Sequence, residues 1–261
     1  MREITSKENR IFRHALSLKR KKYRDKFGEY LIEGPNLLKE ALKEGVVVET
    51  VFVRPDTGEE ALALIDDPGN GLGDKAFCLS AVLFDELKDT ETPQGVVSVV
   101  RKPELKADRG TEGGNYIVLD RLQDPGNIGT LLRTADAAGF ELAVFMKGTA
   151  DPFGPKVVRS ACGSVFRVPV VFADSYDELL EFVHSRGKRL IATSMDAAKP
   201  YYDCDLGADC AIVIGNEGNG IDPELLMRAD EKIMIPMAGN TESLNASVCG
   251  GILMYERIRR R

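Results

Sequence analysis

The second half of the chain contains three short segments whose residue types could build a ligand site. Each is rich in Gly, Asn and Ser and follows a β-branched apolar run: 124–139 (DPGNIGTLLRTADAAG), 214–220 (IGNEGNG) and 235–247 (IPMAGNTESLNAS). Apolar runs of this kind predict β-strands, and the polar segments predict loops that expose the backbone. Ligands of open α/β sheets bind at the carboxyl ends of the strands, so the three loops predict a ligand site there.

The first segment could place an amide and a guanidinium on one side of a helix. Asn127 falls where that helix is expected to begin, and Arg133 follows nearly two turns later. Thr130 and Thr134 form one polar stripe with Arg133. Asn is also a good helix N-cap, and a lone Arg is usually a solvated charge, so structural and functional roles remain open for both residues.

The second segment ends a buried strand abruptly in residues Asn216, Glu217, Gly218, Asn219 and Gly220. Glu217 is the only acid among them. The glycines permit positive φ and close approach of the backbone to a ligand. A tight turn before a Pro-started helix at 222–228 would explain the same residues, so turn and binding loop are equally consistent with the pattern.

The third segment must turn from a strand into a helix and supplies Asn240, Ser243, Asn245 and Ser247. Residues of these types can cap the helix. Their number exceeds what capping needs, and neutral donors and acceptors of this kind can orient a hydroxyl or an amino-acid-like ligand.

Several common site signatures are missing from the sequence. It contains no Walker motif, no serine nucleophile elbow and no Cys/His pairing. The five cysteines are scattered and the chain has only two histidines, so neither a metal site nor a disulfide framework is expected.

The composition is that of an ordinary globular protein, with 43% hydrophobic and 29% charged residues. We find no apolar window long enough to span a membrane and no apolar run resembling a signal peptide, and therefore expect a cytoplasmic protein.

The charge is unevenly distributed. Residues 1–26 hold ten Lys or Arg and three acids, a net charge of +7 in a chain whose total is −6. A basic arm on an acidic body predicts a phosphate-binding surface, although a solvated helix face would look the same. The candidate nucleic-acid contacts in the arm are Arg10, Arg13, Lys19, Arg20, Lys21 and Lys22.

The sequence divides into a small α/β domain at 1–105, a charged linker with Gly at 106–115, and a larger α/β domain at 116–261. In the first domain we expect helices at 9–22, 35–43 and 82–87 and strands at 46–53, 76–79 and 95–100. In the second we expect strands at 116–120, 142–146, 165–171, 189–193, 211–215 and 232–236 and a last helix at 243–258. Regular strand-helix alternation predicts a mostly parallel sheet with helices on both faces.

The three segments, in this order, resemble the motifs of the SpoU (TrmH) family of RNA ribose 2'-O-methyltransferases, in the SPOUT superfamily. The stretches EYLIEGPNLLKEAL and TPQGVVSVV also resemble the ribosomal-protein-like substrate-binding domain that precedes many members. The resemblance implies an α/β knot, a deep trefoil knot that general topology rules would not predict. It further implies a homodimer formed through the knotted domain, and S-adenosylmethionine as methyl donor.

The family's functional residues can be carried over by position. The catalytic and RNA-phosphate end would comprise Asn127, Arg133, Glu217, Ser243 and Asn245. Donor binding would fall to Thr193, Gly215, Asn216, Gly218, Ile235, Met237, Leu244 and Asn245.

The resemblance leaves the role of Arg133 and the RNA target open. Family proposals make this arginine a general base, but a guanidinium stays protonated, so we favour a clamp on the neighbouring phosphate. Ribosomal RNA is favoured over transfer RNA as substrate. A non-catalytic RNA-binding protein, such as a ribosome assembly factor, is the alternative on the same scaffold. A small-molecule-binding domain conflicts with the basic arm.

Overall fold

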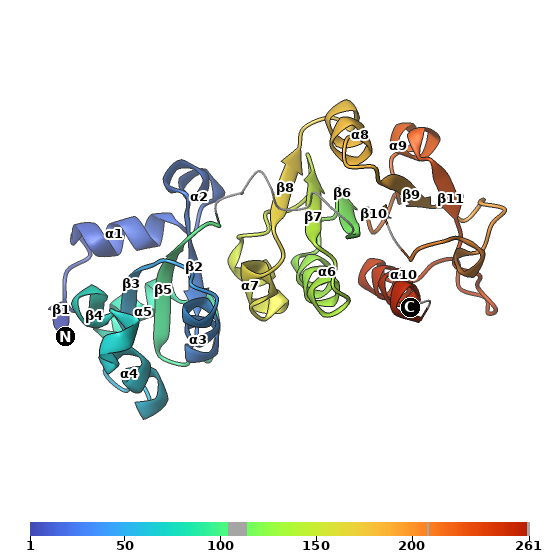
Figure 1. Cartoon of the computed structure of the whole chain (residues 1–261). Helices are drawn as coiled ribbons and strands as arrows, with labels where there is room; N and C mark the ends of the chain where they lie inside the picture. Colours follow the sequence, from blue (N-terminus) through green and yellow to red (C-terminus); the bar gives the residue numbers. More distant parts are fainter. Residues whose placement is uncertain (104–113, 208, 260–261) are drawn as a thin grey trace. The chain divides into compact units, whose positions relative to one another are not determined.

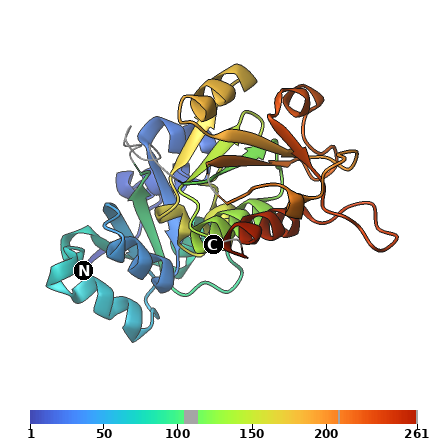
Figure 2. The same cartoon turned by 45° about the vertical axis from the view of Figure 1, so that its right-hand side comes forward.

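The computed structural model describes residues 1–103, 114–207 and 209–259. The chain forms two compact units, each with its own sheet (Figures 1 and 2). One unit contains Met1–Glu104 together with Phe153–Phe166, and the other contains Leu105–Pro152 and Arg167–Arg261. The predicted linker at 106–115 lies outside the described residues except for its last two positions.

The first unit is a five-stranded mixed sheet in the order β1-β4-β3-β5-β2. Its strands are β1 (Arg2–Ile4), β2 (Glu29–Glu33), β3 (Val48–Val53), β4 (Ala76–Leu79) and β5 (Val96–Arg101). Its helices are α1 (Arg10–Ser17), α2 (Lys21–Phe27), α3 (Pro35–Lys43), α4 (Glu59–Asp66), α5 (Ala81–Leu87) and α7 (Pro155–Ala161). A core that includes Phe12, Phe52 and Phe84 holds α1 and α5 against this sheet.

The basic arm is folded differently from the prediction. The single helix expected at 9–22 is two helices, α1 capped by Asn9 and α2. Arg24 of α2 is buried, and its Nη1 donates to the carbonyls of Leu18 and Lys19 between the two helices (2.8 and 2.9 Å), which accounts for the break. Strands β1 and β2 and helix α4 were missed, whereas α3 and β4 have the predicted bounds.

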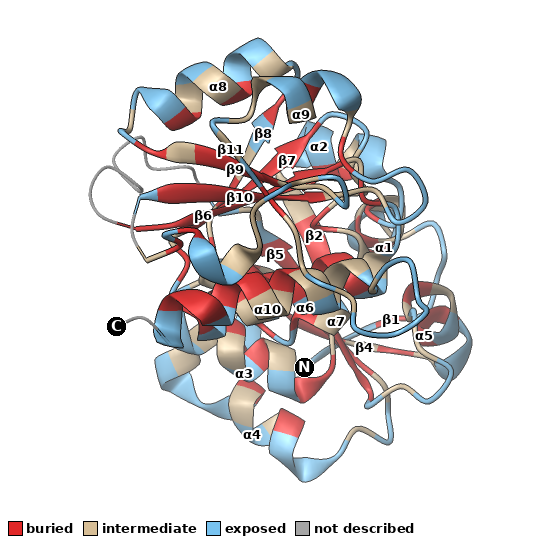
Figure 3. Cartoon of the chain, turned by 90° about the vertical axis from the view of Figure 1, so that its right-hand side faces the viewer, coloured by how far each residue is buried: buried red, intermediate tan, exposed pale blue. Residues whose placement is uncertain are grey.

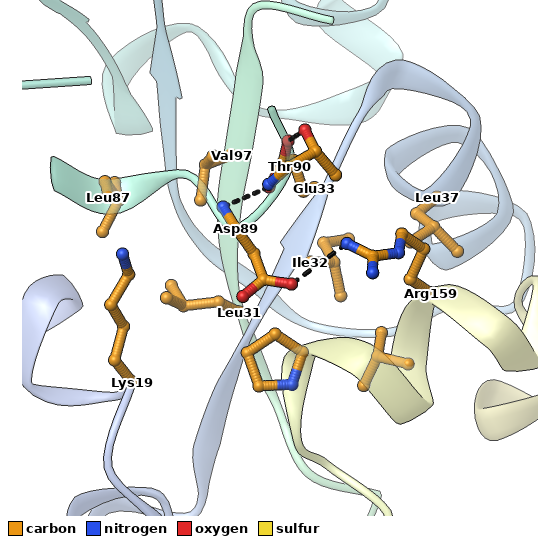
Figure 4. Close-up of a pocket in the computed structure, with 12 residues that line it drawn as sticks. Lys19, Leu31, Ile32, Glu33, Leu37, Leu87, Asp89, Thr90, Val97 and Arg159 are labelled. Carbon is orange, nitrogen blue, oxygen red and sulfur yellow. Dashed lines mark hydrogen bonds and ion pairs between the residues drawn. The ribbon is translucent and has the colours of Figure 1, made fainter. Parts of the chain in front are cut away.

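Helix α7 comes from the later part of the chain but packs on β2 of the first unit (Figure 4). Arg159 of this helix forms an ion pair with Asp89 (3.0 Å). The adjoining turn is held by Glu33, which accepts the N–H of Asp89 (2.7 Å) and the hydroxyl of Thr90. All residues that line the small cavity here belong to the first unit.

The second unit is a six-stranded, wholly parallel sheet in the order β11-β9-β10-β6-β7-β8. Its strands are β6 (Tyr116–Asp120), β7 (Leu142–Met146), β8 (Val170–Ala173), β9 (Arg189–Thr193), β10 (Cys210–Gly215) and β11 (Glu231–Ile233). Its helices are α6 (Pro125–Ala137), α8 (Tyr176–His184), α9 (Pro223–Arg228) and α10 (Ala246–Arg259).

Helices cover both faces of this sheet, as the sequence predicted. Helices α8 and α9 lie on one face, and α6 and α10 lie together on the other (Figure 1). The inner strands β6, β7, β9 and β10 are almost continuously buried because both faces are covered (Figure 3). The strand expected at 165–171 is wrong: β8 begins only at Val170, and Ser164–Phe166 is a 3-10 turn.

Among the described residues, no helix has the length and hydrophobicity needed to cross a membrane.

The bounds of the last strand and the last helix differ from the prediction: β11 ends at Ile233 rather than at 236, and α10 begins at Ala246 rather than at 243. The chain between them, 234–245, is irregular, which leaves the third polar segment at the edge of the sheet.

Candidate functional site

The first polar loop joins the end of β6 to α6. Asp124 caps the helix, its Oδ1 accepting the N–H groups of Gly126 (2.6 Å) and Asn127 (3.1 Å), and Pro125 occupies the first helical position. The interpretation of Asn127 as the N-cap of this helix is therefore wrong. Its N–H is satisfied by Asp124, and its side-chain amide is directed to other loops.

The carboxylate of Glu217 joins the second loop to the first. Its Oε1 accepts Nδ2 of Asn127 (3.1 Å) and the N–H of Asp124 (3.0 Å), and its Oε2 accepts the N–H of Gln123 (3.1 Å). Partial burial favours the neutral acid, but these hydrogen bonds outweigh it and lower the pKa of Glu217. The carboxylate is thus ionised and engaged as an acceptor at neutral pH.

Asn245 connects the third loop to the same amide. Its Nδ2 donates to Oδ1 of Asn127 (2.9 Å), while its Oδ1 accepts the N–H groups of Ser247 (2.9 Å) and Val248 (3.3 Å) at the start of α10. Glu217, Asn127 and Asn245 therefore form one hydrogen-bonded chain across all three loops.

A tight turn follows β10. Asn216 and Gly220 form a backbone bridge, and Oδ1 of Asn216 accepts the N–H groups of Gly218 and Asn219 (3.0 Å each). Gly215 is required at the start because a Cβ there would lie 2.2 Å from the backbone nitrogen of Ile221. The turn is therefore stabilised by hydrogen bonds to the Asn216 side chain, and the backbone of Ile221 packs closely against Gly215.

Beside this turn is a pocket of about 690 Å³, a size typical of small-molecule sites. All eight residues predicted to bind a cofactor line it: Thr193, Gly215, Asn216, Gly218, Ile235, Met237, Leu244 and Asn245. Glu217 and Ser243 line it as well, so the pocket receives side chains from the second and third loops together.

One wall of the pocket was not predicted; it is formed by Ser194, Met195 and Asp196 after β9. Other lining residues that were not predicted are Asn219, Leu226, Glu242 and Cys249. The chain after β9 lacks the Gly/Asn/Ser pattern of the other loops. The sequence could have indicated this segment only by its position at the carboxyl end of a predicted parallel strand, where ligands bind.

The two remaining predicted catalytic residues lie on the surface. Arg133 is exposed on α6, nearly two turns beyond Asn127. Ser243 is also exposed, and its carbonyl accepts the hydroxyl of Thr241 (3.2 Å).

The predicted RNA contacts of the arm are exposed on α1, on α2 and between them: Arg10, Arg13, Lys19, Arg20, Lys21 and Lys22. Lys19 differs from the rest because its ammonium donates to the carbonyls of Glu86 (2.5 Å) and Lys88 (2.9 Å). Burial lowers the pKa of Lys19 against the opposing effect of nearby carboxylates. It therefore also ties the arm to the end of α5.

Residues 114–255, which contain the whole pocket and all three loops, match the model of the SpoU rRNA methylase family. The chain belongs to the SpoU rRNA methylase family. Residues 9–98 match the MRM3-like substrate binding domain. The resemblance inferred from the three motifs is confirmed, and so is the identity of the domain in front of them.

Curated SpoU relatives are similar over nearly the whole chain. The 23S rRNA (guanosine(2553)-2'-O)-methyltransferase RlmP of Bacillus subtilis is 35% identical, covering 98% of each chain. The 23S rRNA (uridine(2479)-2'-O)-methyltransferase of Streptomyces viridochromogenes is 30% identical, covering 100% of this chain and 93% of the relative.

Among solved structures, the AdoMet-bound rRNA methyltransferase from Sinorhizobium meliloti superposes with a TM-score of 0.85 at 30% identity, covering 99% of this chain and 98% of the other. The SpoU methyltransferase AviRb from Streptomyces viridochromogenes, in complex with AdoMet, gives 0.86 at 29%, covering 97% and 98%. These SpoU structures have the knot fold, and the expected fold class is confirmed.

Proposed function

We propose that this protein methylates a ribose 2'-hydroxyl in ribosomal RNA, with S-adenosylmethionine as the methyl donor. The observation that carries the proposal is the hydrogen-bonded chain of Glu217, Asn127 and Asn245, which joins three loops beside one pocket. The names of the 23S rRNA methyltransferase relatives support both the reaction and the kind of RNA.

The pocket suits S-adenosylmethionine in size and in character. Ile235, Met237 and Leu244 would provide apolar contacts to the donor, and the turn after Gly215 would offer backbone hydrogen-bonding groups. We assign donor binding to these residues with Thr193, Asn216, Gly218 and Asn245. The donor supplies a sulfonium methyl group that is already activated toward attack by an oxygen nucleophile.

The protein's own residues then have to place the ribose hydroxyl and stabilise the charge that develops on its oxygen. Asn127 and Asn245 hold each other by their amides at the edge of the site, so their orientation is fixed before RNA binds. Glu217 fixes Asn127 in turn, which makes its carboxylate an orienting group rather than a general base. Ser243, on the pocket wall, is assigned to the RNA end.

Arg133 is assigned to the neighbouring RNA phosphate. It is exposed on the same helix as Asn127, where an incoming backbone can reach it. A guanidinium binds a phosphate through two parallel hydrogen bonds and stays protonated, so it can also stabilise oxyanion charge. This assignment makes it a clamp and not a base.

The first unit is proposed to select the RNA. The exposed basic residues at the α1–α2 junction present a phosphate-binding surface. The match to a substrate binding domain supports this role. We also propose a cytoplasmic location, which the similarity to bacterial rRNA methyltransferases supports.

We also propose that the protein forms a homodimer through its methyltransferase unit. Helix α10 buries Gly250, Leu253 and Met254 against its own unit, and its opposite side exposes Val248 and Tyr255, each 49% accessible. An apolar stripe on a helix that already has one packed face suits a second copy of the chain.

The reaction can be tested with purified protein and S-adenosylmethionine carrying a labelled methyl group. We expect label transfer to 23S rRNA that lacks the modification, with the product mapped to a single ribose. Transfer to tRNA alone would contradict the rRNA assignment. Calorimetry showing no donor binding would favour the non-catalytic RNA-binding alternative.

A further inference from the structure

The residue after β6 has an unusual backbone conformation that is held from outside. Arg121 has φ 59°, in the left-handed region that residues other than glycine rarely adopt. Its N–H donates to Oγ1 of Thr149 (3.0 Å), and this hydroxyl donates to the carbonyl of Leu119 (2.8 Å). Neighbouring structure therefore specifies where the Arg121 side chain and carbonyl point.

The guanidinium of Arg121 lies between two carboxylates. Its Nη2 is 3.1 Å from Oδ2 of the fully buried Asp120, and its Nη1 is 3.5 Å from Oδ2 of Asp222. The same Oδ2 of Asp120 accepts the N–H of Asp222 (2.9 Å). Through these contacts the end of β6 is joined to the residue that caps α9.

Arg121 also contacts both ends of the turn 216–220. Its carbonyl accepts Nδ2 of Asn216 (2.8 Å), and its Nη2 lies 3.5 Å from the carbonyl of Gly220. All five residues of this turn line the pocket. The side chain and the carbonyl of Arg121 therefore stabilise a wall of the pocket, although Arg121 itself does not line the pocket.

We propose that Arg121, with Asp120 and Asp222, is a positioning group that holds the turn 216–220 in the shape required for binding the methyl donor. The proposal rests on the proposed function for its ligand. An ion pair with a buried partner adds little net stability, because desolvation offsets much of the attraction. Its contribution here is to select one conformation of the turn.

Hydrogen exchange of the free protein tests, without any ligand, whether Arg121 stabilises the turn 216–220. Arg121→Asn keeps a residue that tolerates the left-handed conformation but removes the guanidinium. Asp120→Asn combined with Arg121→Asn leaves no uncompensated buried charge if the single variant folds poorly. For both variants we expect the amides of 216–220 to exchange at least tenfold faster, with those of β7 unchanged. Unchanged exchange in the turn would overturn the proposal.

Calorimetry with S-adenosylmethionine tests the consequence for binding. We expect the dissociation constant to rise at least tenfold in both variants while RNA affinity stays the same, and Arg121→Lys to recover part of the loss. Arg228→Gln, which removes a half-buried ion-paired arginine of α9, is the matched control. Wild-type donor affinity in the double variant would overturn the proposal. A wild-type protein that binds no donor would instead contradict the proposed function, and the exchange experiment would still decide whether Arg121 holds the turn.

Discussion

Asn127 and Glu217 lie 90 positions apart in the sequence, and Nδ2 of the first donates to Oε1 of the second over 3.1 Å. The contact is possible because β6 and β10 are adjacent parallel strands, so the loops after them emerge at the same edge of the sheet. Glu217 also accepts two backbone N–H groups of the first loop, so it holds the loop as well as the amide.

Glu217→Gln should destabilise the protein in a pH-dependent way. The pKa of Glu217 is lowered in the folded protein because hydrogen bonds from Asn127, Gln123 and Asp124 outweigh the effect of burial. Its stabilising contribution is therefore present above the unfolded pKa, about 4.3, and is lost as pH falls through the lower folded value. Thermal unfolding from pH 7 to 3 should show a Tm difference from wild type that shrinks on the acid side.

The control for this experiment is Glu181→Gln, which removes an exposed carboxylate of α8. It corrects for the loss of one negative charge. A Tm difference for Glu217→Gln that stays constant from pH 7 to 3 would show that the carboxylate does not stabilise the loops through its charge.

Gly215→Ala should destabilise the turn after β10. Its Cβ would lie 2.2 Å from the backbone nitrogen of Ile221, which cannot move without opening the turn. We expect a loss of about 1–3 kcal/mol of unfolding free energy, the usual cost of overpacking. Gly218→Ala is the matched control because its nearest neighbour would be Oδ1 of Asn216, 3.7 Å away. Equal losses in urea unfolding would argue against close packing at Gly215.

The inner strands of the second unit were predicted well because burial on both faces leaves an uninterrupted apolar run, whereas the edge strands β8 and β11 were not. β6, β7 and β9 have the expected bounds. Predicted bounds are wrong where a tertiary contact decides the structure. The break between α1 and α2 depends on the buried Arg24, and β2 (EYLIE) has acids at both ends that obscure its buried centre.

The residue types of the site could also be predicted, but not their contacts. The sequence analysis considered Asn127 as a possible cap of this helix, whereas the structure uses Asp124, three residues earlier. The hydrogen bond from Asn245 to Asn127 spans 118 positions, and no local pattern encodes it. The pocket wall at 194–196 was missed because ordinary residues form it.

Arg133→Lys should lose most turnover despite keeping its positive charge. A lysine cannot make the two parallel hydrogen bonds of a guanidinium, so the phosphate and developing oxyanion would be held less well. We expect kcat to fall about 10²-fold, the scale for loss of one oxyanion donor, with donor affinity unchanged. Arg228→Lys on α9 is the control. Activity within a few-fold of wild type would exclude the clamp.

The exposed basic residues at the α1–α2 junction should contribute to RNA affinity through phosphate contacts. Arg20→Gln with Lys22→Gln should weaken binding to all RNA sequences alike and reduce the salt slope of log K by about one to two. Filter binding from 50 to 300 mM salt would measure both.

Substitution is preferable to truncating the arm before Phe27, because Phe12, Ala15 and Leu18 belong to the core of the first unit. Lys19→Gln provides a contrast, since Lys19 is bonded to carbonyls at the end of α5 and its loss should also lower Tm. An unchanged salt slope in the double variant would remove the arm from the RNA-binding surface.

The exposed stripe of α10 should control the oligomeric state. Val248→Asp with Tyr255→Asp places charges on the side of the helix that faces away from its own unit, so the fold should persist while association is lost. Light scattering coupled to size exclusion should show a dimer for the wild type and a monomer for the variant. Val82→Asp, at a residue 66% exposed on α5, is the control for an added surface charge. A dimer that survives the double substitution would place the interface elsewhere, and a monomeric wild type would contradict the homodimer itself.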